Sequence, residues 1–115
     1  MAPRLTHIIT PAAWAAARAG GSHEPPSLAA EGFIHFSTPE QLLATAARHY
    51  RGAGALLVLG VDPDRLTAEL RWDDVPALRQ AFPHVYGPLN TDAVVAVATL
   101  VESAGGFELG RWQDI

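Results

Sequence analysis

The chain contains no cysteine and no lysine, and both absences exclude whole classes of chemistry. Without cysteine there are no disulfides, no thiolate-rich zinc sites and no cysteine nucleophile. All eight basic residues are arginine, so Schiff-base chemistry and a P-loop lysine are excluded as well. The lack of cysteine also fits a reducing compartment.

Positive charge and long apolar runs are scarce too. The formal net charge is −4 and no basic run occurs, which argues against broad nucleic-acid binding but leaves room for one small anion. No stretch approaches the roughly 18 apolar residues that a membrane span requires. The opening stretch, MAPRLTHIIT, lacks the pattern of a signal peptide. We therefore expect a soluble, cytoplasmic protein with no membrane partner.

The composition suits one folded domain. With 115 residues, 49% hydrophobic and 17% charged, the chain predicts a single domain over residues 1–115. Thr10-Pro11 and Thr38-Pro39 each predict the start of a helix, the second through a capping box with Gln41. Most strand-like runs follow these two helices, so the order favours an α+β fold over a doubly wound one. Strands are expected at 4–10, 32–37, 55–62, 66–72, 93–101 and 106–112, with 22–30 as a loop and 73–83 as irregular or one helical turn.

The stretch GFIHFST places a histidine in a strand that leads directly into a helix. Alternation along the strand puts Phe33, His35 and Ser37 on one face. With Thr38 and the free N–H groups of the helix start, His35 and Ser37 would form a phosphate or carboxylate pocket. The alternative is that Thr38 only caps the helix and that His35 is an interior histidine with its hydrogen bonds satisfied.

Two further histidines lie in runs that resemble strands or rigid loops. In RLTHIIT, His7 shares a face with Leu5 and Ile9, so it is either a ligand group or a buried histidine bonded to a carbonyl. In FPHVYGPL, two prolines stiffen the chain and His84 and Tyr86 face the same way. That arrangement suits a ligand site, or a structural loop in which Tyr86 packs and His84 is solvated.

Other familiar sites are not supported by the spacing. The histidines follow no H-x-x-x-H pattern, so we expect no bound metal, although a three-histidine metal site is chemically possible. No G-x-S-x-G elbow marks a serine nucleophile. The stretch GAGALLVLG does not match a dinucleotide-binding G-x-G-x-x-G turn.

Several stretches together resemble the DUF952 family of small bacterial proteins: THIITPAAWAAARAGG, EGFIHFSTPEQLLATAARHYRG, LLVLGVDPDRL, LRWDD and FPHVYGPLNTDAVVAV. The resemblance covers nearly the whole chain. It implies an ADP-ribosyltransferase-like fold, with two early helices packed on a split, mostly antiparallel sheet, and similarity to RNA 2′-phosphotransferases. In that fold the first strand carries a ligand-contacting residue, here His7, and FIHFST matches a second segment through His35 and Ser37.

The resemblance also implies NAD as the substrate and a nucleotide or phosphate ligand as the partner. His35, His84 and Asp73 would be catalytic, Asp73 standing in for the late glutamate of the toxin-type enzymes, with Glu102 as a weaker choice. RNA transfer is not expected, because the chain is acidic and short. The alternatives are a non-catalytic nucleotide- or phosphate-binding module and a three-histidine metal-dependent hydrolase. The ligand-binding groups would be His7, Ser37, Thr38 and, stacking on a ring, Tyr86.

Overall fold

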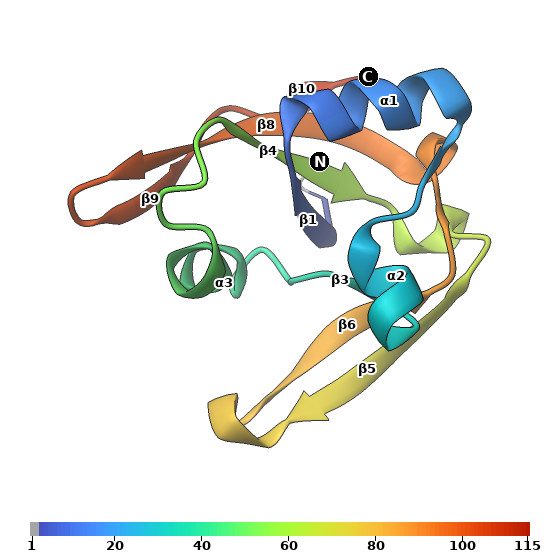
Figure 1. The fold of residues 1–115 in the computed structure, drawn as a ribbon, viewed down its shortest axis with the longest axis horizontal. Helices are drawn as coiled ribbons and strands as arrows, with labels where there is room; N and C mark the ends of the chain where they lie inside the picture. The colour runs from blue at the N-terminus through green and yellow to red at the C-terminus, as the bar shows by residue number, and fades with distance from the viewer. Residues whose placement is uncertain (1–2) are drawn as a thin grey trace.

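The computed structural model describes residues 3–115, and its largest element is a five-stranded antiparallel sheet (Figure 1). The strands are β1 (Leu5–Ile9), β4 (Leu56–Val61), β8 (Val94–Ser103), β9 (Gly106–Leu109) and β10 (Gln113–Asp114). Their order is β1-β4-β8-β10, and β9 also pairs with β8. Because β8 is ten residues long, β4 covers one of its edges while β9 and β10 share the other.

A second sheet carries the residues of interest. It consists of β3 (Ile34–His35), β6 (Gln80–Tyr86) and β5 (Glu69–Val75), in the order β3-β6-β5. The expectation that residues 73–83 are irregular is wrong over most of that range, because β5 and β6 form a hairpin whose connection contains the 3₁₀ turn Pro76–Leu78. Adjacent aspartates, Pro76 and Pro83 hide the strand alternation there. Pro83 has no N–H to donate, but its carbonyl still accepts a bond from the Phe36 N–H at 3.0 Å.

The helices partly match expectation. In α1 (Pro11–Gly20) the Thr10 hydroxyl accepts from the Ala13 N–H at 3.2 Å, and Gly21 ends the helix at φ 82°. The predicted loop 22–30 was wrong in part: it contains β2 (Ser22–His23), paired with β7 (Leu89–Asn90), and most of α2 (Pro26–Glu31). The helix predicted to begin after Thr38 begins later, as α3 (Leu42–His49). Two further 3₁₀ turns cover Pro63–Arg65 and Thr91–Ala93.

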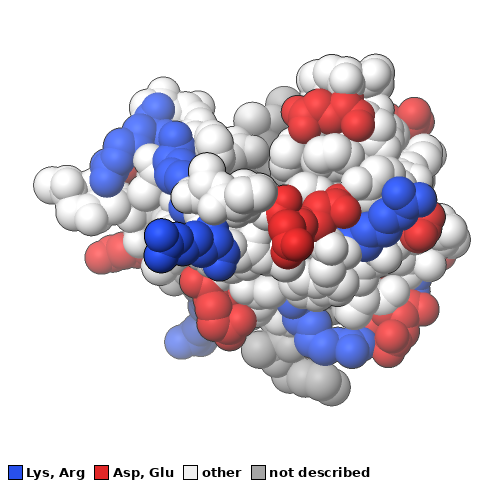
Figure 2. Space-filling view, turned by 90° about the horizontal axis from the view of Figure 1, so that it is seen from below, with Lys and Arg blue, Asp and Glu red and all other residues white. Residues whose placement is uncertain are grey.

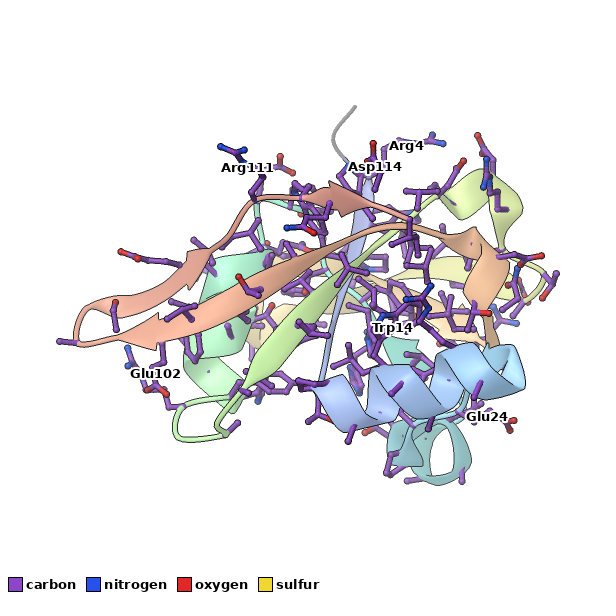
Figure 3. All side chains as sticks on the ribbon, turned by 90° about the horizontal axis from the view of Figure 1, so that it is seen from above. Arg4, Trp14, Glu24, Glu102, Arg111 and Asp114 are labelled. Carbon is purple, nitrogen blue, oxygen red and sulfur yellow. The ribbon has the colours of Figure 1, made fainter. Side chains whose placement is uncertain are left out.

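Both faces of the five-stranded sheet are covered, which explains the continuous apolar run of β4. On one face Trp14 of α1 packs with Leu59 and Val61, and Figure 3 shows Trp14 between the helix and the sheet. On the other face Leu42 and Ala46 of α3 pack against β4 and β8. The fold is therefore α+β with antiparallel sheets, as the order of the elements predicted.

A short bridge joins the two sheets. The Thr6 N–H donates to the Ser37 carbonyl at 2.8 Å, and the Ser37 N–H donates back to Thr6 at 2.9 Å. The Thr6 hydroxyl makes a further bond to the same carbonyl at 2.8 Å. This bridge brings β1, with His7, next to β3, with His35.

Candidate functional site

Pairing of β3 with β6 sets His35 directly opposite His84. Their ring centroids lie 5.2 Å apart, with the planes nearly perpendicular at 79°. Phe33 stacks on the His84 ring at 4.1 Å and meets the His35 ring edge-on at 5.0 Å. We call Phe33, His35, Asp73, His84 and Tyr86 the His35–His84 cluster.

Asp73 connects β5 to this cluster through two hydrogen bonds to one oxygen. Its Oδ2 accepts from His84 Nδ1–H at 2.8 Å and from the Tyr86 hydroxyl at 2.5 Å. These two bonds lower the pKa of Asp73, the tyrosine contributing most, and the same contact raises the pKa of Tyr86. Asp73 is thus an ionised acceptor at neutral pH.

The bond to Asp73 also defines the tautomer of His84. An ionised carboxylate can only accept, so Nδ1 of His84 carries the proton and Nε2 of the neutral ring is an acceptor. Within residues 3–115, no side chain or backbone group forms a hydrogen bond with this Nε2. Every fully buried side-chain nitrogen or oxygen in that range has a hydrogen-bond partner, so an atom without one must be exposed to solvent. His84 Nε2 therefore keeps contact with solvent although the residue as a whole is only 6% exposed.

His35 has its own carboxylate. Its Nε2 lies 3.0 Å from Glu31 Oε2, and both side chains are about half exposed. Glu31 closes α2, the helix that the sequence did not predict, and no signal in the sequence pointed to it. The site therefore presents two imidazoles, each held by a carboxylate.

Tyr86 is less free than expected. The Arg71 guanidinium lies 4.3 Å from its ring centroid, and Arg71 is fixed by Glu69 at 2.9 Å. One ring face of Tyr86 is therefore covered, and stacking of a ligand ring there would require Arg71 to move. The sequence did not point to Arg71, because no local pattern identifies the residue that pairs with His84 across the hairpin.

His7 lies behind the cluster rather than on it. Its Nδ1–H donates to the His35 carbonyl at 2.7 Å, and its Nε2 faces His23 Nε2 at 3.3 Å. Burial lowers the pKa of His7 to about 4, against a smaller opposing effect of the bond to His35. Burial lowers the pKa of His23 as well. Both rings are neutral at pH 7, with His23 donating and His7 accepting.

Ser37 and Thr38 are used inside the fold. The Ser37 hydroxyl, 4% exposed as a residue, donates to Thr45 at 3.1 Å, so it does not join His35 as expected from strand alternation. Thr38 and Gln41 do exchange the two bonds of a capping box, at 3.0 and 3.2 Å. That exchange closes a turn ahead of α3, because the helix itself begins only at Leu42.

The other carboxylate considered, Glu102, lies on β8 and is engaged elsewhere. It accepts from the Gly52 N–H at 2.9 Å and lies 3.4 Å from Arg51. Asp73 is thus the candidate carboxylate that joins the cluster. Within residues 3–115, no group of three or more histidine, cysteine, aspartate or glutamate side chains is arranged to hold a metal ion.

One hollow in the described chain lies away from this chemistry. It has a volume of about 650 Å³ and is lined in part by Arg4, Asp62 and Asp64, which already pair with one another. We assign the site to the His35–His84 cluster because its imidazoles and carboxylates can move protons. Figure 2 shows the lower face of the molecule with basic and acidic side chains interspersed rather than gathered by sign.

Comparison with known proteins identifies the family. No helix within residues 3–115 has the length and apolar character that a membrane crossing needs. A search of curated proteins finds no match. The crystal structure of CC0527 from Caulobacter crescentus is similar at 35% identity and a TM-score of 0.79, covering 95% of this chain and 92% of that one. The solution structure of CC0527 matches at 36% identity and 0.75, covering 90% and 89%. A family model described as a protein of unknown function, DUF952, matches residues 8–97, and the chain belongs to that family.

Proposed function

We propose that this protein binds an ADP-ribosyl nucleotide such as NAD at the His35–His84 cluster and transfers or releases its ADP-ribosyl group. The observation that carries the proposal is the Asp73–His84 pair, which leaves His84 Nε2 as an open proton acceptor next to a second imidazole. The ADP-ribosyl part follows from the resemblance of FIHFST and THIIT to segments of ADP-ribosyltransferase-like proteins. It is supported by the order β1 with His7, then α1, and β3 with His35, then α3.

The proposed reaction joins an acceptor hydroxyl to the ribose carbon of the nucleotide. The acceptor oxygen forms a bond to C1′ while the bond from C1′ to nicotinamide breaks, its electron pair going to the nicotinamide nitrogen. The acceptor proton goes to His84 Nε2, and ionised Asp73 stabilises the imidazolium that results. The carboxylates of Asp73 and Glu31 also favour the positive charge that develops at the ribose carbon.

His35 orients the acceptor or a phosphate in this proposal, and His7 acts through the backbone. His7 holds the His35 carbonyl at 2.7 Å, which fixes β3 relative to β1. A direct contact of His7 with a ribose hydroxyl would require the ligand to reach past His23, because His23 Nε2 is already hydrogen-bonded to His7 Nε2. We therefore assign His7 a positioning role and His35 and His84 the contacts with ligand.

A non-catalytic nucleotide- or phosphate-binding module is the second candidate. It is favoured by the engagement of the Ser37 and Thr38 hydroxyls inside the fold and of Arg71 with Glu69. Fewer groups are then free to hold and orient a phosphate for reaction. The metal-dependent hydrolase gains no support from the arrangement of donors in residues 3–115.

Calorimetry and product analysis distinguish these candidates. Native protein should bind NAD and ADP-ribose, and nicotinamide should be released from NAD, as measured by mass spectrometry. His84→Gln should slow release about 100-fold, the range for loss of a general base, with a smaller effect on binding. His49→Gln, which alters an exposed histidine of α3, is the matched control and should change neither.

Each outcome of these measurements supports or excludes one candidate function. Binding of ADP-ribose and NAD without release of nicotinamide would establish the binding module instead of the enzyme. No binding of either nucleotide would overturn the proposal. A thermal shift offers a parallel check, since ligand at 100 times its Kd stabilises the folded state by about 2.7 kcal/mol.

A further inference from the structure

A groove adjoins the His35–His84 cluster and shares Tyr86 with it. Its volume is about 320 Å³, at the lower end of the range of about 300–1,000 Å³ typical of small-molecule pockets. It can therefore hold part of a nucleotide rather than a whole dinucleotide. Its lining includes Gly21, Ser22, Thr67, Ala68, Gly87 and Pro88.

The walls of this groove are tied together before any ligand arrives. A Cβ placed on Gly87 would lie 2.8 Å from the Cβ of Ala68, so the two segments approach as closely as a glycine allows. Asn90 accepts from the Thr67 N–H at 3.1 Å and pairs with Ser22 across β2 and β7. A preformed groove loses little conformational entropy on binding.

The chemistry of the lining differs from that of the cluster. All the lining residues, which fall within the described chain, are uncharged, and several carry only a hydrogen or a methyl group. Tyr86 and Pro88 add flat apolar surface. Asp73 and Arg71, both charged, contact Tyr86 but do not line the groove.

We infer that this groove binds the neutral nucleoside end of the ligand, while the reacting ribose or phosphate lies on the His35–His84 cluster. The inference rests on the proposed function and deepens it by dividing the ligand between two surfaces. Tyr86 marks the boundary, because its hydroxyl is held by Asp73 and the same residue lines the groove. A planar uncharged ring fits the small-residue slot, whereas a phosphate would find no countercharge there.

The test fills the groove without touching the cluster. Ser22→Phe places a ring in the slot, and Ser103→Phe makes the same change at the exposed end of β8, where the chain turns into β9. The probes are adenosine, ADP-ribose and ribose 5-phosphate, measured by calorimetry. Ser22→Phe should weaken adenosine and ADP-ribose at least about tenfold, and ribose 5-phosphate less than about threefold. Ser103→Phe should leave all three unchanged.

A second measurement keeps the test open if Ser22→Phe does not fold. Adenosine titrated into native protein should shift the backbone NMR signals of Gly21, Thr67 and Gly87, and leave those of the Ser103 turn in place. ADP-ribose binding that Ser22→Phe does not weaken, or shifts that avoid the groove, would overturn the groove alone. No binding of any probe to native protein would overturn the proposed function together with it.

Discussion

The molecule contains two histidine pairs, His7 with His23 and His35 with His84, and the shielded members His7 and His84 differ in their partners more than in their burial. His7 and His84 are almost equally shielded, at 8% and 6% exposed. His7 meets a carbonyl and a neutral imidazole, neither of which balances the charge of a protonated ring. His84 meets the carboxylate of Asp73, which does. The His7–His23 pair is therefore suited to hold the fold at neutral pH, and the His35–His84 pair to exchange protons.

Acid should disrupt the His7–His23 pair first, and this is the largest effect we expect. Because the pKa of His7 falls from 6.5 to about 4 on folding, the unfolded chain binds more protons between those values. The stability from neutral His7 is complete above pH 6.5 and is lost as the pH falls towards 4, amounting to about 3 kcal/mol. Urea unfolding between pH 7 and pH 4 measures it.

The variant that isolates this effect is His7→Gln. Its amide can still donate to the His35 carbonyl and accept from His23, but it does not titrate. The pH dependence of its unfolding free energy should be shallower than that of native protein, whereas His49→Gln should match native protein. Equal slopes for native protein and His7→Gln would show that other groups set the acid sensitivity.

The His35–His84 pair should respond to loss of the Asp73 carboxylate rather than to acid unfolding. Asp73→Asn keeps the shape but removes the charge, so His84 is free to adopt the wrong tautomer. We expect nicotinamide release to fall at least about tenfold, with little change in the urea midpoint at pH 7. Ultraviolet titration should also show the pKa of Tyr86 returning towards 10, since its bond to Asp73 raises it. Asp74→Asn, on the exposed neighbour, is the control.

Much of this arrangement was accessible from the sequence where the contacts are local. The helix start at Thr10-Pro11 and the strands expected at 55–62 and 93–101 follow from rules that act within a few residues. His84 and Tyr86 were correctly placed on the same side of the chain, because two-residue alternation holds in β6.

The remaining features depend on which strand lies beside which. The register that sets His35 against His84 and Arg71 against His84 joins distant segments, and no local pattern specifies it. The hairpin was missed because Asp73, Asp74 and Pro76 interrupt the alternation. Ser37 was expected beside His35 since both fall in one run, but β3 ends at His35 and Ser37 pairs with Thr6 instead.

A smaller effect is expected at the boundary between the cluster and the groove. Tyr86→Phe keeps the ring against Arg71 but removes one of the two bonds to Asp73. The pKa of Asp73 should rise towards its usual value, because the tyrosine bond is the larger cause of its depression. NMR titration of the Asp73 carboxyl should show this rise, while adenosine affinity stays within about twofold of native. An unchanged pKa of Asp73 would mean that the Tyr86 hydroxyl does not contribute to its depression.

The smallest effect should come from Glu31, and it tests whether carboxylate partners matter when they are exposed. The contact with His35 at 3.0 Å joins two side chains that are each about half exposed, so solvent screens it. Glu31→Gln should change the free energy of unfolding by less than about 1 kcal/mol, and raising the salt concentration should make native protein and variant still more alike. If Glu31→Gln cost more than about 1 kcal/mol, or if salt left the difference between native protein and variant unchanged, this exposed contact would contribute more to stability than solvent screening allows.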